Sequence, residues 1–266
     1  DHEVQGRMTL RPFAGADRDA PMDGCALDPL RDGSHQVVVS CGLALAMGEV
    51  DPYQMACHGV DEALRNCIAS GGTLERAALI DNYAWGDVRD PKILGQIVEC
   101  SRGAADAARA YGTPFISGKD SLHNTYRAGG VSRSIPPVLL VSAISVAKGP
   151  LCVPGSDLKD VGSTMVLLGP EAAIAGSLLQ LKYGGTGGTP ACFDPQLGPK
   201  LLQTLRKWIV AHRVRAVHDL SDGGLAVAAC EMAFGGTAVG IDLEIDGPAE
   251  DRLAHLVGEG PHRFLI

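Results

Sequence analysis

The sequence predicts an α+β chain of two subdomains, residues 1–154 and 155–266, with the boundary near Gly155. Three observations favour this prediction. Segments with helical apolar spacing alternate with short β-rich segments along the chain. The stretch 148–160, KGPLCVPGSDLKD, is rich in glycine, proline and charge, as links between domains are. Only 5% of the residues are aromatic, so we expect a core of aliphatic side chains and alanine.

The elements of the first subdomain follow from residue spacing. We expect a buried strand over 37–47, a helix over 54–70, a strand over 76–80, a polar loop over 81–90, and a long helix from Pro91 to Gly112. Proline suits the first turn of a helix and glycine suits the position after its end.

The remainder of the first subdomain is expected to be β-rich. It comprises a strand over 115–117, a Gly-Lys-Asp-Ser turn over 118–121, a hairpin turn at 129–130 and a strand over 137–146.

In the second subdomain, strands and helices continue to interleave. In order, we expect a strand over 164–168, a helix over 171–181, a glycine-rich loop over 184–188, a helix from about Pro195, a strand over 215–218, a helix after Gly224 and a strand over 263–266. The sequence stops on that last apolar segment, which suggests a fragment of a longer protein.

Composition argues against several functions. The 266 residues are 45% hydrophobic and 20% charged, which is typical of a globular chain with a large core. A formal net charge of −8 and the absence of a basic cluster argue against a nucleic-acid partner. Neither a membrane span nor a secretion signal is found, so we expect a cytoplasmic protein. The eight cysteines form no Cys-x-x-Cys pair, which favours reduced thiols over zinc or disulfides.

The Gly-Lys-Asp-Ser segment is a candidate phosphate and metal site. Gly118 lets the backbone approach a ligand, Lys119 offers a positive charge, Asp120 could hold a hard cation, and Ser121 could bond a phosphate oxygen. An ordinary polar turn is the alternative interpretation.

A second candidate is the segment 218–224, HDLSDGG. His218, Asp219 and Asp222 lie at a strand-to-helix turn, where backbone N–H groups favour anions and carboxylates can bind a cation. In the structural alternative, Asp219 or Ser221 caps the helix while His218 packs in the core.

Two other patterns are weaker. The glycine-rich loop over 184–188 lacks the Lys-Ser/Thr pair of a Walker A loop, so a surface loop is favoured. His58 and Glu62 lie at i,i+4 without a zinc motif around them, and they are interpreted as a surface or core-edge pair.

Four segments, in order, resemble the phosphoribosylformylglycinamidine synthase family. They are HGVDEALRNCIASGG over 58–72, AALIDNYAWGDVRDP over 77–91, GTPFISGKDSLHN over 112–124 and VHDLSDGGLAVAACEMAF over 217–234. The resemblance is to the second of the two AIR-synthetase-like halves of that synthetase. It implies a subdomain with a curved mixed sheet and helices, followed by an α/β sandwich that lacks its last elements.

The resemblance also implies the chemistry. In the family, ATP and Mg²⁺ drive the amidation of formylglycinamide ribonucleotide with ammonia. The family's ATP-contacting Asp falls on Asp81, Gly118 would face ATP, and Ser121 would face the substrate. Lys119 stands where many members have a magnesium-binding Asn. Because a cation cannot bind magnesium, the metal would move to Asp120 or another ligand, or be absent, and Lys119 would contact phosphate directly.

Asp219 is the second candidate metal ligand. Separately, Asp23, in Asp23-Gly24-Cys25-Ala26, resembles the Asp-Ala-Ala of the family's N-terminal subdomain.

The resemblance also implies partners for this chain. The family's general-base His lies in the first half of the synthetase, which matches no segment here, so no catalytic residue is assigned and little turnover is expected from this chain alone. A glutaminase subunit or domain would supply ammonia. The first half of the synthetase would pair with this half, and a homodimer could form through the strands over 37–47 and 137–146.

Two alternatives stay open. Another AIR-synthetase-superfamily enzyme, such as aminoimidazole ribonucleotide synthetase, would share the HDLSDGG-type turn but not the Gly-Lys-Asp-Ser context or the Asp81 loop. A noncatalytic nucleotide-binding or scaffold module would keep the fold and lose turnover.

Overall fold

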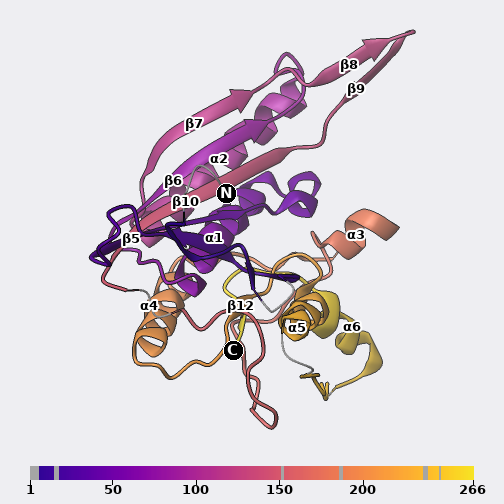
Figure 1. Cartoon of the computed structure of the whole chain (residues 1–266). Helices are drawn as coiled ribbons and strands as arrows, with labels where there is room; N and C mark the ends of the chain where they lie inside the picture. The colour runs from indigo at the N-terminus through magenta and orange to yellow at the C-terminus, as the bar shows by residue number, and fades with distance from the viewer. Residues whose placement is uncertain (1–5, 15–17, 151–152, 186–187, 236–238, 246) are drawn as a thin grey trace.

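The computed structural model describes residues 6–14, 18–150, 153–185, 188–235, 239–245 and 247–266. A six-stranded sheet and two long helices form the upper part of the molecule in Figure 1, and a small sheet with four shorter helices forms the lower part. The α+β class predicted from the sequence is confirmed.

The large sheet is mixed. Its order is β1-β4-β5-β10-β6-β7, and only the β6–β7 pair is parallel. The strands are β1 (Met8–Leu10), β4 (Gly24–Leu27), β5 (His35–Gly42), β6 (Ala77–Ala84), β7 (Phe115–Ser121) and β10 (Val138–Lys148).

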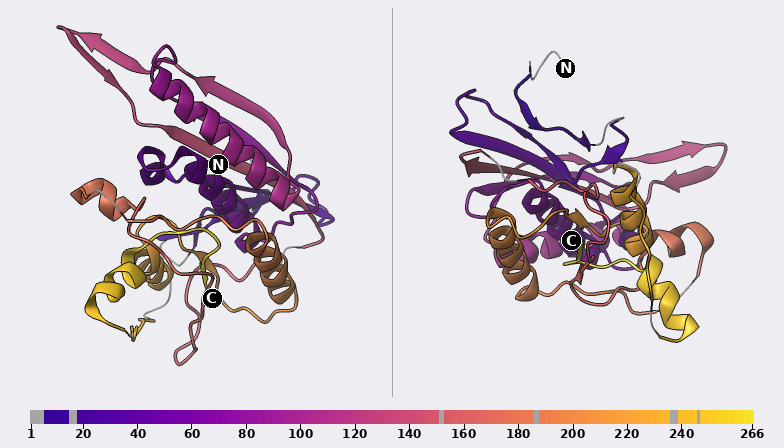
Figure 2. Two further views of the ribbon diagram at one scale, coloured as in Figure 1. Left: turned by 180° about the vertical axis from the view of Figure 1, so that it is seen from behind. Right: turned by 60° about the horizontal axis from the view of Figure 1, so that its bottom comes forward.

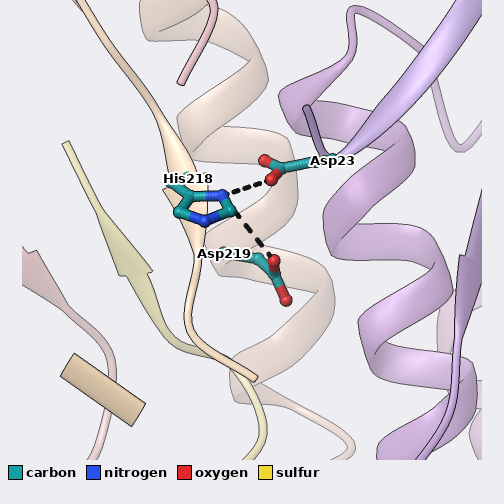
Figure 3. Close-up of side chains that lie close together, drawn as sticks. All are labelled: Asp23, His218 and Asp219. Atoms are coloured by element: carbon teal, nitrogen blue, oxygen red, sulfur yellow. Dashed lines mark hydrogen bonds and ion pairs between the residues drawn. The ribbon is translucent and has the colours of Figure 1, made fainter. Parts of the chain in front are cut away.

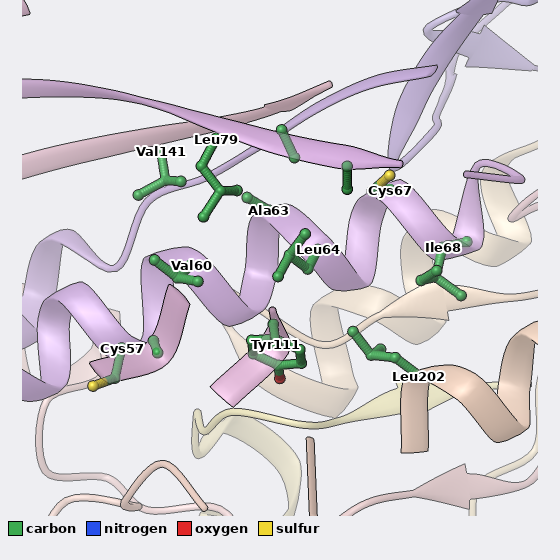
Figure 4. Packing of buried hydrophobic residues seen from close by; sticks show 14 of the residues in the cluster. Cys57, Val60, Ala63, Leu64, Cys67, Ile68, Leu79, Tyr111, Val141 and Leu202 are labelled. Atoms are coloured by element: carbon green, nitrogen blue, oxygen red, sulfur yellow. The ribbon is translucent and has the colours of Figure 1, made fainter. Parts of the chain in front are cut away.

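Helix α1 (Pro52–Ala69) is the centre of the core. Asp51 caps its first turn by accepting a hydrogen bond from the Gln54 amide, and Pro52 occupies the first position. One side of α1 packs on β5 and β10, while the other meets α4 (Leu197–Val210) and β12 (His218–Asp219). Figure 4 shows Val60 and Leu64 of α1 among apolar residues from both parts of the chain. The larger apolar cluster therefore includes residues of both parts, and a smaller one lies around α5 (Gly224–Phe234).

Helix α2 (Pro91–Tyr111) confirms the second predicted helix. Asp90 caps its start, and Gly112 ends it in the left-handed region at φ 67°, which favours glycine. The predicted turn at Gly129-Gly130 is also present, between β8 (Thr125–Ala128) and β9 (Val131–Ser134). This hairpin projects from the body in Figures 1 and 2.

Several boundaries differ from the predictions. The strand over 37–47 ends at Gly42, and a 3₁₀ helix, η1 (Leu45–Glu49), follows. A side chain at position 42 would collide with the α1 backbone at Gly59. The loop over 81–90 begins only after Ala84, since Asp81 and the three residues after it pair with both β10 and β7. The Gly-Lys-Asp-Ser segment is not a turn: it continues β7 to Ser121.

The lower part differs more. The helix predicted over 171–181 is limited to α3 (Leu178–Tyr183), and α6 (Ala249–Val257) was not predicted. A three-stranded sheet joins β11 (Leu167–Leu168), β13 (Phe264–Leu265) and β12, and α5 (Gly224–Phe234) packs beside it. Two short strands, β2 (Phe13–Ala14) and β3 (Ala20–Pro21), pair near the N-terminus.

Two predictions from composition can be compared with the described residues. The seven described cysteines are all free, and Cys152 lies outside the described residues, as do residues 186 and 187 of the glycine-rich loop. Every described helix is too short or too polar to cross a membrane.

Candidate functional site

Asp81 and Gly118 are direct neighbours on the parallel strands β6 and β7. A Cβ atom at position 118 would overlap the Asp81 carboxylate. A side chain at this position would therefore force the Asp81 carboxylate to move. The loop and the turn that the sequence suggested are two adjacent strands, and they bring these two candidate residues together.

The pleat divides the candidate residues between the two faces of the sheet. Asp81 lies on the helix-covered face with Leu79, so its neighbour Gly118 and the alternate residue Asp120 share that face. Lys119 and Ser121 project from the opposite face, where the Lys119 ammonium donates a hydrogen bond to the Ser121 hydroxyl. The five predicted residues thus form two groups on the two adjacent strands β6 and β7.

The environment of Asp81 disfavours its charge. Burial and the nearby Asp120 carboxylate raise the Asp81 pKa, and a hydrogen bond from the Lys119 amide acts in the opposite sense. A cation bound beside Asp81 would favour the charged form of its carboxylate.

A second cluster surrounds His218 (Figure 3). Its Nδ1 donates to Asp23 and its Nε2 donates to Glu231 over 2.9 Å. Burial lowers the His218 pKa, but the charge and hydrogen bond of Asp23 and the hydrogen bond of Glu231 outweigh it and raise the pKa to about 11. His218 is therefore an imidazolium at neutral pH, held between two carboxylates.

Asp219 belongs to the same cluster. One potential ligand atom from each of Asp23, His218 and Asp219 lies within 4.8 Å of the others, so these residues could hold a metal. Asp219 also accepts a hydrogen bond from Arg65 Nη2 over 3.2 Å. In this structure Arg65 and the protonated His218 compensate the carboxylates, and a divalent cation would have to displace the imidazolium proton.

A buried network behind this cluster was missed by sequence reasoning. Asp61 on α1 accepts hydrogen bonds from the Tyr111 hydroxyl, from His262 Nδ1 over 2.6 Å and from the His262 amide over 2.8 Å. Because the Asp194 amide donates to His262 Nε2, that nitrogen carries no proton. The available signal was the pair Asp61 and Arg65, one helical turn apart on an otherwise apolar helix.

His58 and Glu62 do not pair with each other. His58 is 8% exposed and its Nε2 contacts the Ala191 carbonyl over 2.8 Å, while burial lowers its pKa to about 4. Glu62 accepts a hydrogen bond from the Leu43 amide, and its pKa is raised by burial and by Asp219. The core-edge interpretation is therefore the better of the two.

The capping alternative for Asp219 or Ser221 is wrong. Helix α5 starts after Gly223, and neither side chain caps it. Instead, Glu259 accepts hydrogen bonds from the amides of Gly223 and Leu178.

The two carboxylate clusters are separate. Asp81 pairs with Val141, and Val141 pairs with Gly42, so Asp81 lies two strands, or about 10 Å, from Gly42. Helix α1 packs over the middle of this row through Gly59. Among the described residues, no hydrogen bond or ion pair joins Asp120 to Asp219.

Two models of the AIR synthase related proteins match the chain in series: the N-terminal domain matches residues 22–147 and the C-terminal domain matches residues 160–266. The chain therefore belongs to the AIR synthase related proteins, as the four resembling segments predicted.

Among individual proteins, the chain is similar to phosphoribosylformylglycinamidine synthase subunit PurL of Beijerinckia indica, at 32% identity over 92% of this chain and 33% of the relative. Two structures of Thermotoga maritima PurL match its fold. The complex with FGAR has a TM-score of 0.63 and 18% identity over 96% of this chain and 41% of that one. The complex with ATP has a TM-score of 0.61 and 16% identity over 93% of this chain and 35% of that one. The chain spans about a third of the length of its curated relatives.

Proposed function

We propose that this chain is part of an ATP-dependent C–N ligase that converts formylglycinamide ribonucleotide to formylglycinamidine ribonucleotide in de novo purine biosynthesis. The relatives carry the name of that synthase, and the structural neighbours include PurL proteins solved with FGAR or with ATP. A cytoplasmic location agrees with this role.

The β6–β7 edge is the proposed nucleotide site. Asp81, Gly118 and Lys119 would contact ATP, Asp120 would hold Mg²⁺, and Ser121 would contact the substrate. The observation that carries this assignment is the close fit of the Asp81 carboxylate against Gly118 on adjacent strands. In the described part of the chain β7 is an edge strand, so a phosphate chain lying along it could contact residues of both faces.

Magnesium fits this edge by its chemistry. Carboxylate oxygens are its preferred ligands, and the Asp120 carboxylate raises the pKa of Asp81. When bound, the metal would neutralise phosphate charge. Lys119 would bind a phosphate oxygen as a point charge, and its contact with Ser121 would orient both groups. Asp219 is the second proposed metal ligand, and it fits less well because of the Arg65 and His218 charges.

Calorimetric titration with Mg-ATP tests the nucleotide site. We expect saturable binding to the wild-type chain and at least tenfold weaker binding to Asp81→Asn, because a charge-assisted contact typically contributes about 1.5–3 kcal/mol. Glu99→Gln, which removes an exposed carboxylate from α2, is the matched control. Equal affinity of Asp81→Asn and the wild type would refute the site. Binding without turnover would favour the noncatalytic module.

The face of the large sheet opposite α1 is a candidate surface for partner binding. Val39 and Ile80 are each 37% exposed on the face opposite α1, and the β10 residues between them are half-buried. We propose that this face pairs with the other half of the synthetase or, in the isolated chain, with a second copy. The relative's printed name calls it a subunit, which supports an assembly with a glutaminase that supplies ammonia.

Light scattering tests the pairing. The wild-type chain is expected to dimerise, and Ile80→Lys is expected to make it monomeric. Val98→Lys is the control, since Val98 is 43% exposed on α2. A monomeric wild-type chain at high concentration would exclude the homodimer.

A further inference from the structure

Arg263 is a buried cation without a carboxylate partner. Its side chain is 2% exposed, and among the described residues its only hydrogen bond runs from Nη1 to the Gly258 carbonyl over 3.2 Å. Its Nε is buried without an acceptor. Burial and the positive charge of Arg65 lower its pKa to about 10. Burying a charge without a counter-charge costs free energy, so an anion bound beside the Arg263 guanidinium would be stabilising.

Arg263 lines a cavity of 420 Å³ in the lower part of the molecule. The remaining wall is mostly aliphatic and comes from Met165, Leu167, Leu225, Leu243, Ile245 and Leu265. Arg263 directly precedes β13 and lines the cavity together with Leu265, whose side chain belongs to the apolar cluster around α5. The cation therefore lies at an apolar wall, where its attraction for an anion is weakly screened.

The cavity has polar lining residues besides Arg263, among them His255 in the last turn of α6. Glu171 and Glu244 also line the cavity, but both are exposed and neither forms an ion pair with Arg263 among the described residues. Solvent screens the repulsion between these two carboxylates and an anion in the cavity.

We propose that this cavity binds a small apolar carboxylate whose charged group pairs with Arg263 and whose hydrocarbon body lies against the leucines. The volume is in the range of small-molecule sites. This site is distinct from the β6–β7 edge and from the His218 cluster, so it does not depend on the proposed ATP chemistry.

Calorimetric titration of the full chain with octanoate tests the proposal, with 1-octanol as the uncharged probe of equal length. We expect saturable octanoate binding, and binding of 1-octanol about tenfold weaker or more, as loss of a charge-assisted hydrogen bond predicts. Arg263→Lys should keep part of the affinity and Arg263→Met should lose it.

Because Arg263→Met alters a buried position, a second variant keeps the test decisive. Leu243 is 41% exposed, so Leu243→Glu should fold normally while it places a carboxylate in the cavity that competes with octanoate. Far-ultraviolet circular dichroism checks the fold of each variant. Failure of octanoate to bind the wild type, or equal binding to wild type and a folded Leu243→Glu, would overturn the proposal without affecting the nucleotide site.

Discussion

Arg65 on α1 donates a hydrogen bond to Asp219 on β12 over 3.2 Å, with side-chain exposures of 3% and 5%. Its other terminal nitrogen lies 3.4 Å from Asp61. One guanidinium therefore serves two buried carboxylates, and it connects the helix beneath the large sheet to the strand that carries the His218 cluster. The arrangement of the second candidate site depends on this cation.

Replacing Arg65 should destabilise the fold strongly. We expect Arg65→Met to lower the free energy of unfolding by about 3–5 kcal/mol, because it leaves two buried carboxylates without their cation. Urea denaturation measures this change. Arg102→Met removes a guanidinium from an exposed pair with Glu99, and its cost should stay below about 1 kcal/mol. Equal costs for the two variants would show that the buried network does not stabilise the fold.

Gly118→Ala should disturb the β6–β7 edge. The added methyl group would overlap the Asp81 carboxylate, so we expect weaker Mg-ATP binding and lower stability. The double variant Asp81→Ala/Gly118→Ala should recover stability relative to the sum of the single changes. Gly95→Ala is the matched control: nothing lies near its added Cβ on α2, and it should stabilise the helix by about 0.5–1 kcal/mol. Additive effects at 81 and 118 would contradict the contact.

Glu259 should make stability depend on pH. Burial raises its pKa from 4.5 to about 7. The folded chain then keeps a proton that the unfolded chain has lost, so this group makes stability fall as pH rises from about 4.5 to about 7. Glu259→Gln keeps an acceptor for the Gly223 amide and should remove this part of the slope, as urea denaturation across that pH window would show. If the slope in Glu259→Gln equals that of the wild type, Glu259 is not the source of this pH dependence. Glu99→Gln is the control.

Tyr111→Phe should test the Asp61 network. Loss of the hydroxyl removes a donor to a buried carboxylate and should cost about 2 kcal/mol of unfolding free energy. Tyr126→Phe, at a position that is 67% exposed, should cost almost nothing. Thermal denaturation of both variants provides the comparison, and a neutral Tyr111→Phe would mean that the hydroxyl contributes no net stability.

Helices with strong local signals were predicted well. Pro91 and Gly112 mark the start and the end of α2 as predicted, because such signals depend on neighbours in sequence. The helix predicted over 54–70 begins two residues earlier, at Pro52, where Asp51 is the cap. Strand lengths were underestimated at 81–84 and 118–121, since polar residues there are held by pairing with distant strands that local spacing cannot reveal. The division between residues 154 and 155 stays a prediction.

The residue types of the candidate sites could be predicted from the sequence, but their arrangement in space could not. The sequence placed Asp81 and Gly118 in one site, and strand pairing makes them neighbours. It could not show that Lys119 and Ser121 face away from them, because that follows from treating the segment as a strand rather than a turn. The partners of His218 come from positions 23 and 231, which only the folded chain brings together.

The most direct test of the account is a crystal structure of the chain with Mn²⁺ and the non-hydrolysable analogue AMPPCP, using anomalous scattering to locate the metal. The account predicts manganese at Asp81 and Asp120, with phosphate oxygens beside Lys119 along β7. Manganese and nucleotide bound at Asp23 and Asp219, with the β6–β7 edge empty, would contradict it.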